Sequence, residues 1–335
     1  MKDKRNNSID IFRLVCALLV VAIHTHPFAD INEYVGYFCT SVLTRIAVPF
    51  FFCVSGYYYV EKLEKIGLRA FKDTSKKILK IYIVWSIIYS VINVIQYINS
   101  GANINGIMYT LFIDFFINGS YYHFWYFIAL FISIILVTIC YKMKMQNIFF
   151  YGTIILYVIG LLGCSYYAVG NHIPVVNYII NLAGFEWFRK MFFMGVPFFS
   201  LGYFIKRYLE KDNGRTMKIY QIVLVIGVFL AEIIVVNQLG WVKNIVITIS
   251  LYMLVGCVMI FLIQHPMEEA RKYGKSFRML ANWTYYVHPL VIMLIKVFIG
   301  DINTVGLFLV TCMISLVSGF ILINVGGWFK RILLE

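Results

Sequence analysis

Residues 9–24 read IDIFRLVCALLVVAIH, an apolar run interrupted by Asp10 and Arg13 and closed by His24. A helix needs about 20 predominantly apolar residues to cross a hydrocarbon layer roughly 30 Å thick. Similar runs recur along the 335 residues, of which 61% are hydrophobic and 13% charged. This composition excludes a soluble globular protein and a disordered chain. The sequence therefore predicts an all-α, polytopic integral membrane protein.

Ten apolar segments of suitable length are separated by polar breaks. They cover residues 9–27, 40–60, 78–98, 123–141, 148–164, 189–205, 219–237, 243–263, 280–298 and 304–324. Residues 106–118 form a shorter apolar segment, which we expect in the outer interface or dipping back into the membrane. Because no internal repeat or low-complexity tract is visible, residues 1–335 are expected to form a single transmembrane domain.

The positions of Lys and Arg indicate the topology, because cytoplasmic loops carry an excess of both. Alternate connections, counted from the N-terminus, hold most of the 29 basic residues, whereas the intervening connections hold only Arg189, Lys190, Lys243 and Lys296. We therefore expect both termini in the cytoplasm and a multi-pass location in the cell membrane. The net charge of +13 then faces membrane lipids, and no nucleic-acid-binding pattern accompanies it.

Ionisable side chains inside apolar segments are costly and usually line a cavity. Arg13 and His24 are separated by a rotation of roughly 20° and a rise of about 16 Å on a helix, so they share one face at two depths. Asp10 lies one turn before Arg13 and can pair with it. We expect this face to line a passage, with Arg13 binding donor phosphates and His24 taking a hydroxyl proton. Alternatively, Arg13 extends to the inner headgroups and His24 caps the helix.

The second apolar segment contains RIAVPFFFCVSGYY, residues 45–58. Arg45 is expected to stabilise an oxyanion or a carboxylate. Pro49 is expected to kink the residues that follow it. Ser55 and Gly56 indicate either site residues or close helix packing through small side chains.

Three further groups have a functional and a structural interpretation. In YYHFWYF, residues 121–127, His123, Trp125 and Tyr126 bind an acceptor hydroxyl or belong to an aromatic belt. Glu186 and Arg189 either contribute to the site or form a local ion pair. In TYYVHPL, residues 284–290, His288 either touches the donor or holds a kink at Pro289.

The Arg13-x10-His24 pair, VPFFFCVSGYY, YYHFWYF and TYYVHPL, in this order, resemble the membrane-bound acyltransferase family 3, and most closely the membrane domain of vancomycin-resistance-type serine racemases. The resemblance spans nearly the whole chain. It implies a ten-helix protein that moves an acyl group, commonly acetyl from acetyl-CoA, onto hydroxyl groups across the cytoplasmic membrane. It also implies that Arg13 and His24 are the essential pair, and that Arg45 and Trp125 shape the cavity.

Two departures from the family pattern affect the expected substrates. No region of the 335 residues is expected to form the racemase domain of the resistance proteins or the esterase-like domain of some polysaccharide-modifying relatives. Lys76, Lys77 and Lys80 stand where many members carry arginines, so they attract CoA phosphates without the fork geometry of a guanidinium.

The expected function is therefore membrane O-acyltransfer from cytoplasmic acyl-CoA, acetyl-CoA in the first place, to a hydroxyl of an acceptor such as a cell-envelope glycan. The expected catalytic residues are His24, His123 and Arg45, the donor-binding residues Arg13, Lys76, Lys77, Lys80 and His288, and the acceptor-binding residues Trp125, Tyr126, Glu186 and Arg189. No Cys or His spacing indicates a metal site, and a homo-oligomer is compatible with the sequence. The alternative is a small amino-acid (serine) transporter, for which the paired VPFFF and VPFFS segments hint at related halves.

Overall fold

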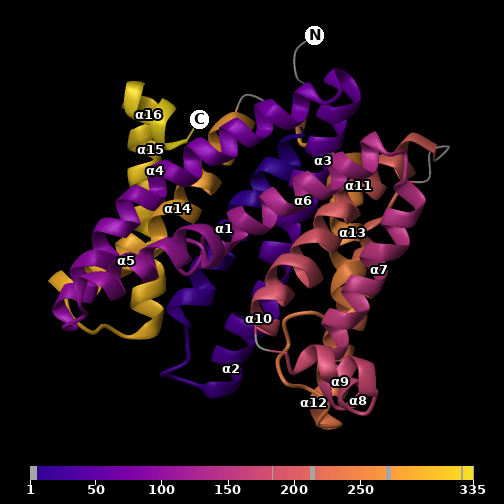
Figure 1. Ribbon diagram of the computed structural model, residues 1–335, viewed down its shortest axis with the longest axis horizontal. Coiled ribbons are helices and arrows are strands. Elements are labelled where there is room, and N and C mark those ends of the chain that lie inside the picture. The colour runs from indigo at the N-terminus through magenta and orange to yellow at the C-terminus, as the bar shows by residue number, and fades with distance from the viewer. Residues whose placement is uncertain (1–5, 183, 212–215, 269–272, 326, 335) are drawn as a thin grey trace.

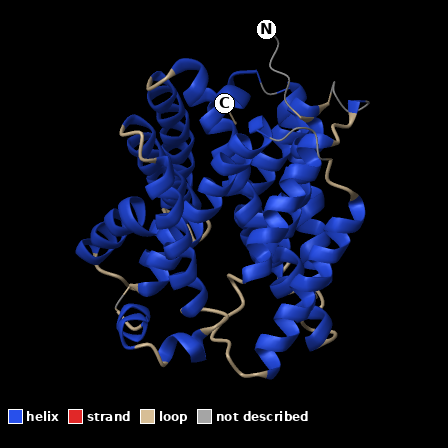
Figure 2. Ribbon diagram, turned by 90° about the vertical axis from the view of Figure 1, so that its right-hand side faces the viewer, coloured by secondary structure: helices blue, strands red, loops and turns tan. Residues whose placement is uncertain are grey.

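The computed structural model describes residues 6–182, 184–211, 216–268, 273–325 and 327–334. Every regular element in these ranges is a helix, and none of the described residues forms a strand (Figures 1 and 2). The all-α prediction is therefore confirmed. Six residues that contribute to the basic connections lie outside the described residues: Lys2, Lys4, Arg5, Arg215, Arg271 and Lys272.

Each of the ten predicted segments overlaps an α-helix of the structure. These helices are α1 (Asn7–Thr25), α3 (Ala47–Ile66), α4 (Arg69–Asn99), α6 (Trp125–Lys142), α7 (Gln146–Leu162), α11 (Val196–Lys211), α12 (Ile219–Gln238), α13 (Ile249–Gln264), α14 (Gly274–Phe298) and α15 (Thr304–Val325). The shorter helices are α2 (Glu33–Tyr37), α5 (Ile104–Ile113), α8 (Tyr167–Asn171), α9 (Pro174–Ile180), α10 (Phe185–Phe188) and α16 (Gly327–Leu333).

Length and composition allow six stretches of the described chain to cross a membrane. They are α1, the continuous stretch Glu33–Ile66, α4, α6, α12 and α15. The helices α7 and α13 are apolar but shorter, as is Ile104–Asn118, which contains the predicted interfacial segment. Ten spans and the interfacial position of residues 106–118 stay predictions.

Polar side chains fix the start of α1 against the end of α13. The Asn6 side-chain oxygen accepts from the backbone amides of Ser8 at 2.9 Å and Ile9 at 3.4 Å, which caps the helix. The Asn6 amide group donates to the Leu262 carbonyl at 2.6 Å. At its other end α1 stops at His26, whose φ of 49° lies in the left-handed region just before Pro27. The depths of Arg13 and His24 in the bundle follow from this docking.

The first turn of α1 and the last helix, α16, lie at the same end of the bundle. Arg278, near the start of α14, contacts Asp10 of α1, and the Trp85 indole of α4 donates to the Leu333 carbonyl of α16 at 3.1 Å. Figure 1 shows α16 at one end and α2, α8, α9 and α10 at the other. We call the former the basic end, because the Lys-rich and Arg-rich connections gather there. A cytoplasmic location of the basic end stays a prediction.

Helices α3 and α11 pack backbone against backbone. A Cβ on Gly56 would overlap the Phe199 carbonyl oxygen, and a Cβ on Gly202 would overlap the Cys53 carbonyl oxygen. The small-residue interpretation of Gly56 is therefore confirmed.

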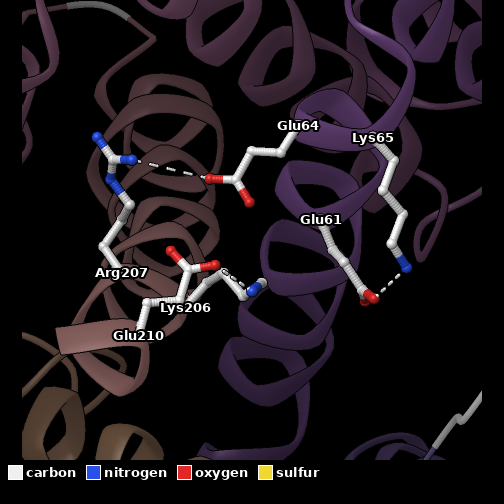
Figure 3. A network of polar contacts seen from close by, with 6 residues as sticks. All are labelled: Glu61, Glu64, Lys65, Lys206, Arg207 and Glu210. Carbon is white, nitrogen blue, oxygen red and sulfur yellow. Dashed lines mark hydrogen bonds and ion pairs between the residues drawn. The ribbon is translucent and has the colours of Figure 1, made fainter. Parts of the chain in front are cut away.

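Charged side chains surround the basic end of the same helix pair. Figure 3 shows Arg207 of α11 facing Glu64 of α3, 3.9 Å apart, beside the Lys65 to Glu61 pair at 2.6 Å within α3. Ion pairs as exposed as these contribute little stability, so the glycine contacts dominate the packing of α3 on α11.

Irregular turns precede the prolines of α3 and α11. A π-helical turn, Phe38–Val42, and a 3-10 turn, Leu43–Ile46, lead into α3, and a π-helical turn, Arg189–Gly195, leads into α11. We expected Pro49 to kink the residues after it; these residues form α-helix as far as Ile66, and the irregular turns lie before the proline. Pro49 and Pro197 each lie in a first turn, where no helical donor is needed, so the irregularity falls before them.

Candidate functional site

Three histidines from distant parts of the chain converge inside the bundle. His24 lies in the last turn of α1, His123 just before α6, and His288 in the middle of α14. The ring centroid of His288 lies 5.3 Å from that of His24 and 5.3 Å from that of His123. His123 is 2% exposed and His288 is fully buried, so neither belongs to a lipid-facing aromatic belt. We call these three residues the histidine cluster.

Pro289 explains how the His288 ring is held. Proline lacks an amide hydrogen, so the carbonyl of Tyr285, four residues earlier, has no helical donor. The His288 Nδ1 lies 3.0 Å from this oxygen and 3.1 Å from the Thr284 carbonyl oxygen. Because both neighbours only accept, Nδ1 carries the proton, and in the neutral ring Nε2 is an acceptor. This Nε2 is buried and has no hydrogen-bond partner among the described residues.

Within the described part of the chain, His123 lacks a hydrogen-bond partner at both ring nitrogens, whereas His288 lacks one only at Nε2. Both His123 nitrogens are buried. The backbone is held in place, because the Tyr285 hydroxyl donates to the His123 carbonyl oxygen at 2.6 Å. A buried polar atom without a partner costs about 1–3 kcal/mol, and a bound water or hydroxyl relieves this cost. The arrangement fits a ligand that carries hydroxyl groups.

A cavity of about 190 Å³ opens beside His24 and His123. We call it the His24 cavity; its other polar lining comes from Thr44, Arg45, Trp125, Arg189, Lys190 and Tyr285. The irregular turns before α3 and α11 supply Arg45, Arg189 and Lys190. Short non-α turns of this kind recur at functional sites because they redirect side chains.

Glu186 and Arg189 form the ion pair that we considered as an alternative to a role in the site. The Arg189 Nε donates to the Glu186 carboxylate at 3.0 Å, and Nη2 contacts the same oxygen. The Arg189 side chain is only 9% exposed and also lines the His24 cavity, whereas that of Glu186 is 57% exposed. The structure thus combines both interpretations for Arg189.

A larger cavity of about 620 Å³ adjoins the His24 cavity and shares Trp125 and Lys190 with it. We call it the vestibule. Its lining is rich in aromatic, amide and carboxylate side chains: Asn93, Gln96, Tyr97, Asp114, Asn118, Tyr121, Tyr122, Glu186 and Trp187. Aromatic faces combined with amides and carboxylates suit a polyhydroxylated molecule.

A third cavity, of about 310 Å³, does not include the histidine cluster in its lining. Its basic and amide lining residues are Arg13, Lys62, Lys77, Arg278 and Asn282. We call it the Arg13 cavity. The Arg13 Nη2 donates to the Asn282 side-chain oxygen at 3.1 Å.

The structure places three groups of this region differently from what we expected, and their roles in donor binding stay predictions. Asp10 accepts from Arg278 at 3.3 Å, and the described partner of Arg13 is Asn282 rather than Asp10, because docking of α14 on α1 brings Arg278 within reach. Of the three candidate lysines only Lys77 lines the Arg13 cavity; Lys76 is exposed, and the Lys80 amine donates to the Arg331 carbonyl at 2.8 Å. His288 lies with His24 instead of along the Arg13 cavity.

The two cavities meet at Tyr285, which lines both. Tyr126 and Phe51 pack against Tyr285, with ring centroids 5.7 Å and 6.1 Å away. Tyr126 lines the Arg13 cavity and contacts the Ser55 hydroxyl at 3.2 Å, so it lies away from the acceptor-binding position that we expected for it. The passage expected along α1 is thus divided by this aromatic partition of Phe51, Tyr126 and Tyr285.

Sequence reasoning missed Arg278, Asn282 and Tyr285 as cavity residues. They recur every three to four residues along α14 and lead to His288, which is the spacing of one helical face. This periodicity was the signal that would have identified them. Lys190 was counted only as a basic residue of an outer connection, and no sequence pattern indicates that it faces a cavity.

The apolar helices and the buried histidine cavity define a helical membrane protein built around an internal polar site. The chain belongs to the acyltransferase 3 family, whose family model, described as an acyltransferase domain, matches residues 6–324.

Curated relatives carry racemase names. An amino-acid racemase of Enterococcus faecalis is 29% identical over 298 residues, which cover 87% of this chain and 42% of the relative. A serine/alanine racemase of Enterococcus gallinarum is 27% identical over 303 residues, 86% of this chain and 41% of the relative. This chain therefore spans about two fifths of the length of these relatives. No solved structure matches the chain significantly.

Proposed function

We propose that the protein is a membrane O-acyltransferase that moves an acyl group, acetyl in the first place, from cytoplasmic acyl-CoA to a hydroxyl of an acceptor outside the cytoplasm. The observation that carries this proposal is the meeting of two cavities along α1, one at Arg13 and one at His24, with Tyr285 between them. Membership of the acyltransferase family supports the reaction type.

The Arg13 cavity suits the donor. Arg13, Lys62, Lys77 and Arg278 line a cavity of about 310 Å³ near the basic end, together with one acidic residue, Asp73. Asp73 pairs with Lys62 at 3.7 Å and Asp10 pairs with Arg278 at 3.3 Å, so the lining keeps an excess of positive charge. Phosphate groups bind to such side chains, and guanidinium groups bind them with two parallel hydrogen bonds. In this proposal the nucleotide part of acyl-CoA stays at this opening and the acyl thioester extends toward Tyr285.

The His24 cavity and the vestibule suit the acceptor. A pocket that encloses a small molecule has about 300–1,000 Å³. The His24 cavity, about 190 Å³, is therefore large enough for one hydroxyl-bearing end of an acceptor, while the vestibule, about 620 Å³, takes the rest. A cell-envelope glycan has this combination of length and hydroxyl groups.

The histidine cluster supplies the proton chemistry. In our proposal His24 takes the proton of the acceptor hydroxyl, whose oxygen attacks the thioester carbonyl carbon. The C–S bond then breaks, the acyl group stays on the acceptor as an ester, and the CoA thiolate takes up the proton. His288, with Nδ1 held by two carbonyl groups, presents its Nε2 lone pair to the cluster and positions His24. The side chain of Arg45 faces the same cavity and balances the negative charge that develops during attack.

The aromatic partition separates donor and acceptor until both are bound. Tyr285 is held by its hydrogen bond to the His123 carbonyl oxygen and by Phe51 and Tyr126. Rotation of Tyr285 about its side-chain bonds would join the two cavities. A closed partition keeps vestibule water away from the thioester and prevents wasteful hydrolysis.

The direct test uses purified protein in nanodiscs with radiolabelled acetyl-CoA and a hydroxyl acceptor extracted from the cell envelope. We expect CoA release and label transfer that depend on the acceptor, and loss of both in His24→Ala. His172→Ala is the control, because His172 is exposed and lies outside all the cavities described. Transfer that persists in folded His24→Ala would rule out this mechanism.

Serine transport is the second candidate function, and the irregular turns favour it. Transporter sites often lie where broken helices in two halves of the chain meet, and the turns before Pro49 and Pro197 both face the His24 cavity. Uptake of labelled serine into proteoliposomes without acyl-CoA, retained in His24→Ala, would establish transport. We expect no such uptake.

A further inference from the structure

We propose that the acceptor carries an oxyanion, a carboxylate or a phosphate, beside its reacting hydroxyl, and that Arg45 and Lys190 bind this oxyanion. This inference rests on the proposed function only in calling the ligand an acceptor. The binding of an anion in the His24 cavity is argued from the charges of the cavity alone.

Arg45 is oriented toward a ligand. Its Nε donates to the Ser41 carbonyl oxygen at 2.9 Å, one turn earlier, which fixes the plane of the guanidinium group. Its two terminal nitrogens donate to no described residue, and no Asp or Glu of the described chain lies within ion-pair distance. A fixed guanidinium with its outer edge open is suited to bidentate binding of a carboxylate or phosphate.

Lys190 adds a second cation to the same cavity. Its amine lies over the Trp125 ring, 5.9 Å from the centroid, and both residues line the His24 cavity. The ring face attracts the ammonium group but leaves its hydrogens free for an anion. Among the described residues no carboxylate pairs with Lys190 either.

The charge balance of the cavity requires an anion from outside. Arg45, Arg189 and Lys190 line it together with His24 and His123, and none of its lining residues is acidic. Glu186 pairs with Arg189, and no carboxylate of the described chain lies within ion-pair distance of Arg45 or Lys190. Arg45 and Lys190 are half-buried, so each has lost part of its hydration without gaining a carboxylate partner, and an anion in the cavity would replace what is lost. The oxyanion of the reaction exists only during transfer, so it cannot compensate these charges in the resting complex.

The positions of the cations also fit a substrate that reacts through a neighbouring hydroxyl. The basic groups and the two histidines line a single cavity of about 190 Å³, so an anion bound by Arg45 and Lys190 lies within a few bonds of the histidine cluster. Uronic acids, hydroxy acids and sugar phosphates all place an oxyanion at such a distance from a hydroxyl. A neutral sugar would leave the basic side chains without a partner.

Calorimetric titration in phosphatidylcholine nanodiscs, with no acyl-CoA present, tests the proposal. The probes are two matched pairs that differ in the oxyanion: D-glucuronate against D-glucose, and glycerol 3-phosphate against glycerol. We expect at least one anion to bind and both neutral partners to fail. Arg45→Gln and Lys190→Gln should each weaken anion binding about tenfold or more.

Two control variants make the result specific. Lys296→Gln removes an exposed lysine that lines none of the cavities and should leave anion binding unchanged. Arg45→Lys keeps the charge without the fork and should bind the anion more weakly than the natural protein but better than Arg45→Gln. Only variants that elute from gel filtration as the natural protein does are titrated. Differences in affinity among them therefore do not result from unfolding.

Three results of the titration in phosphatidylcholine would overturn the proposal. They are equal binding of the anionic and neutral probes, no binding of either anion at millimolar concentration, and equal anion affinity in Arg45→Gln and Lys296→Gln. Loss of glucuronate binding in phosphatidylglycerol nanodiscs would assign the cations to lipid headgroups and would also overturn it. The titration contains no acyl-CoA, so its result does not depend on acyl transfer. If the anion binds in the titration but the acetyl-CoA assay shows no transfer, the proposed reaction is wrong and the oxyanion site stands.

Discussion

The imidazole rings of His24 and His288 lie nearly parallel, 5.3 Å apart between centroids and 21° apart in orientation, although the residues belong to the first and one of the last helices. Pro289 makes this arrangement possible, because it frees the Tyr285 carbonyl to accept from the His288 Nδ1. The ring of His288 is thus held through Nδ1, and its buried Nε2 has no hydrogen-bond partner among the described residues. His288 is therefore a positioning residue for His24 in the proposed reaction.

Replacing His288 by Gln should lower kcat for acyl transfer by about 100-fold and leave the KM for acyl-CoA unchanged. The amide can still donate to the Thr284 and Tyr285 carbonyl oxygens, but it offers no basic nitrogen to the cluster. Steady-state kinetics as a function of pH measure this, and the acid limb of the kcat profile should move. An unchanged pH profile with a small loss of kcat would reduce His288 to a packing role.

Arg13 and its neighbouring lysines should govern donor affinity. Arg13→Lys removes the fork and should raise the KM for acetyl-CoA about tenfold with little change in kcat. Lys77→Ala should raise this KM a few-fold at low salt, whereas its neighbour Lys76→Ala should not, because only Lys77 lines the Arg13 cavity. Equal effects of the two lysine variants would contradict the assigned donor cavity.

Tyr285 should prevent hydrolysis of the donor. Tyr285→Ala joins the Arg13 and His24 cavities and should increase CoA release without acceptor about tenfold, because water then reaches the thioester. Tyr285→Phe keeps the ring but loses the bond to His123, worth about 1 kcal/mol, and should give a smaller increase. Tyr220→Ala, at an exposed tyrosine of α12, serves as the control. If release without acceptor is the same in all three variants, the partition has no such role.

The face shared by Arg13 and His24 could be predicted from the sequence because it depends on the geometry of one helix. An eleven-residue separation fixes the angle between two side chains whatever surrounds them. The structure places both residues on internal cavities, in agreement with this geometry. The alignment of ten apolar segments with helices follows from the same local physics.

The partners of those residues could not be predicted, because they come from helices far apart in the chain. Asn282 pairs with Arg13 and His288 packs on His24 only after α14 docks on α1. Tyr126 was expected beside His24 but points to the other cavity, since the residue next to it, Trp125, takes that position. Adjacent residues on a helix differ by about 100°, so a small error in helix rotation exchanges their environments.

Asp30 should make the stability of the chain dependent on pH. Its carboxylate accepts from the backbone amide of Thr304 at 2.9 Å and from the Thr304 hydroxyl, at the start of α15. These donors lower the pKa of Asp30 below its ordinary value of 3.8. A lowered pKa stabilises the folded state above the ordinary value, and the contribution is lost as the pH falls through the lowered pKa.

Asp30→Asn should therefore lower the Tm slightly at pH 7, by roughly 1–2 °C, because the carboxylate is exposed. The difference from the natural protein should shrink below about pH 4. Thermal unfolding in detergent at several pH values measures it. A difference that stays constant down to pH 3 would show that the charge of Asp30 does not matter.

Glycine-to-alanine substitutions should separate packing from helix propensity. Gly227 of α12 has open space where a Cβ would lie, so Gly227→Ala should stabilise the protein by up to about 1 kcal/mol through helix propensity alone. Gly56→Ala gains the same propensity but drives a Cβ into the Phe199 carbonyl oxygen, a backbone atom that cannot rotate away. We expect a net destabilisation of about 2 kcal/mol.

The Cys53 contact of Gly202 allows a stricter test of the same interface. Gly202→Ala should destabilise about as much as Gly56→Ala, because both force α3 and α11 apart. Once one substitution has separated the helices, the second meets more space, so the double variant should cost less than the two single variants combined. Thermal unfolding of the four proteins gives this coupling. Strict additivity would mean that each glycine is accommodated locally and that the two helices do not move as a unit.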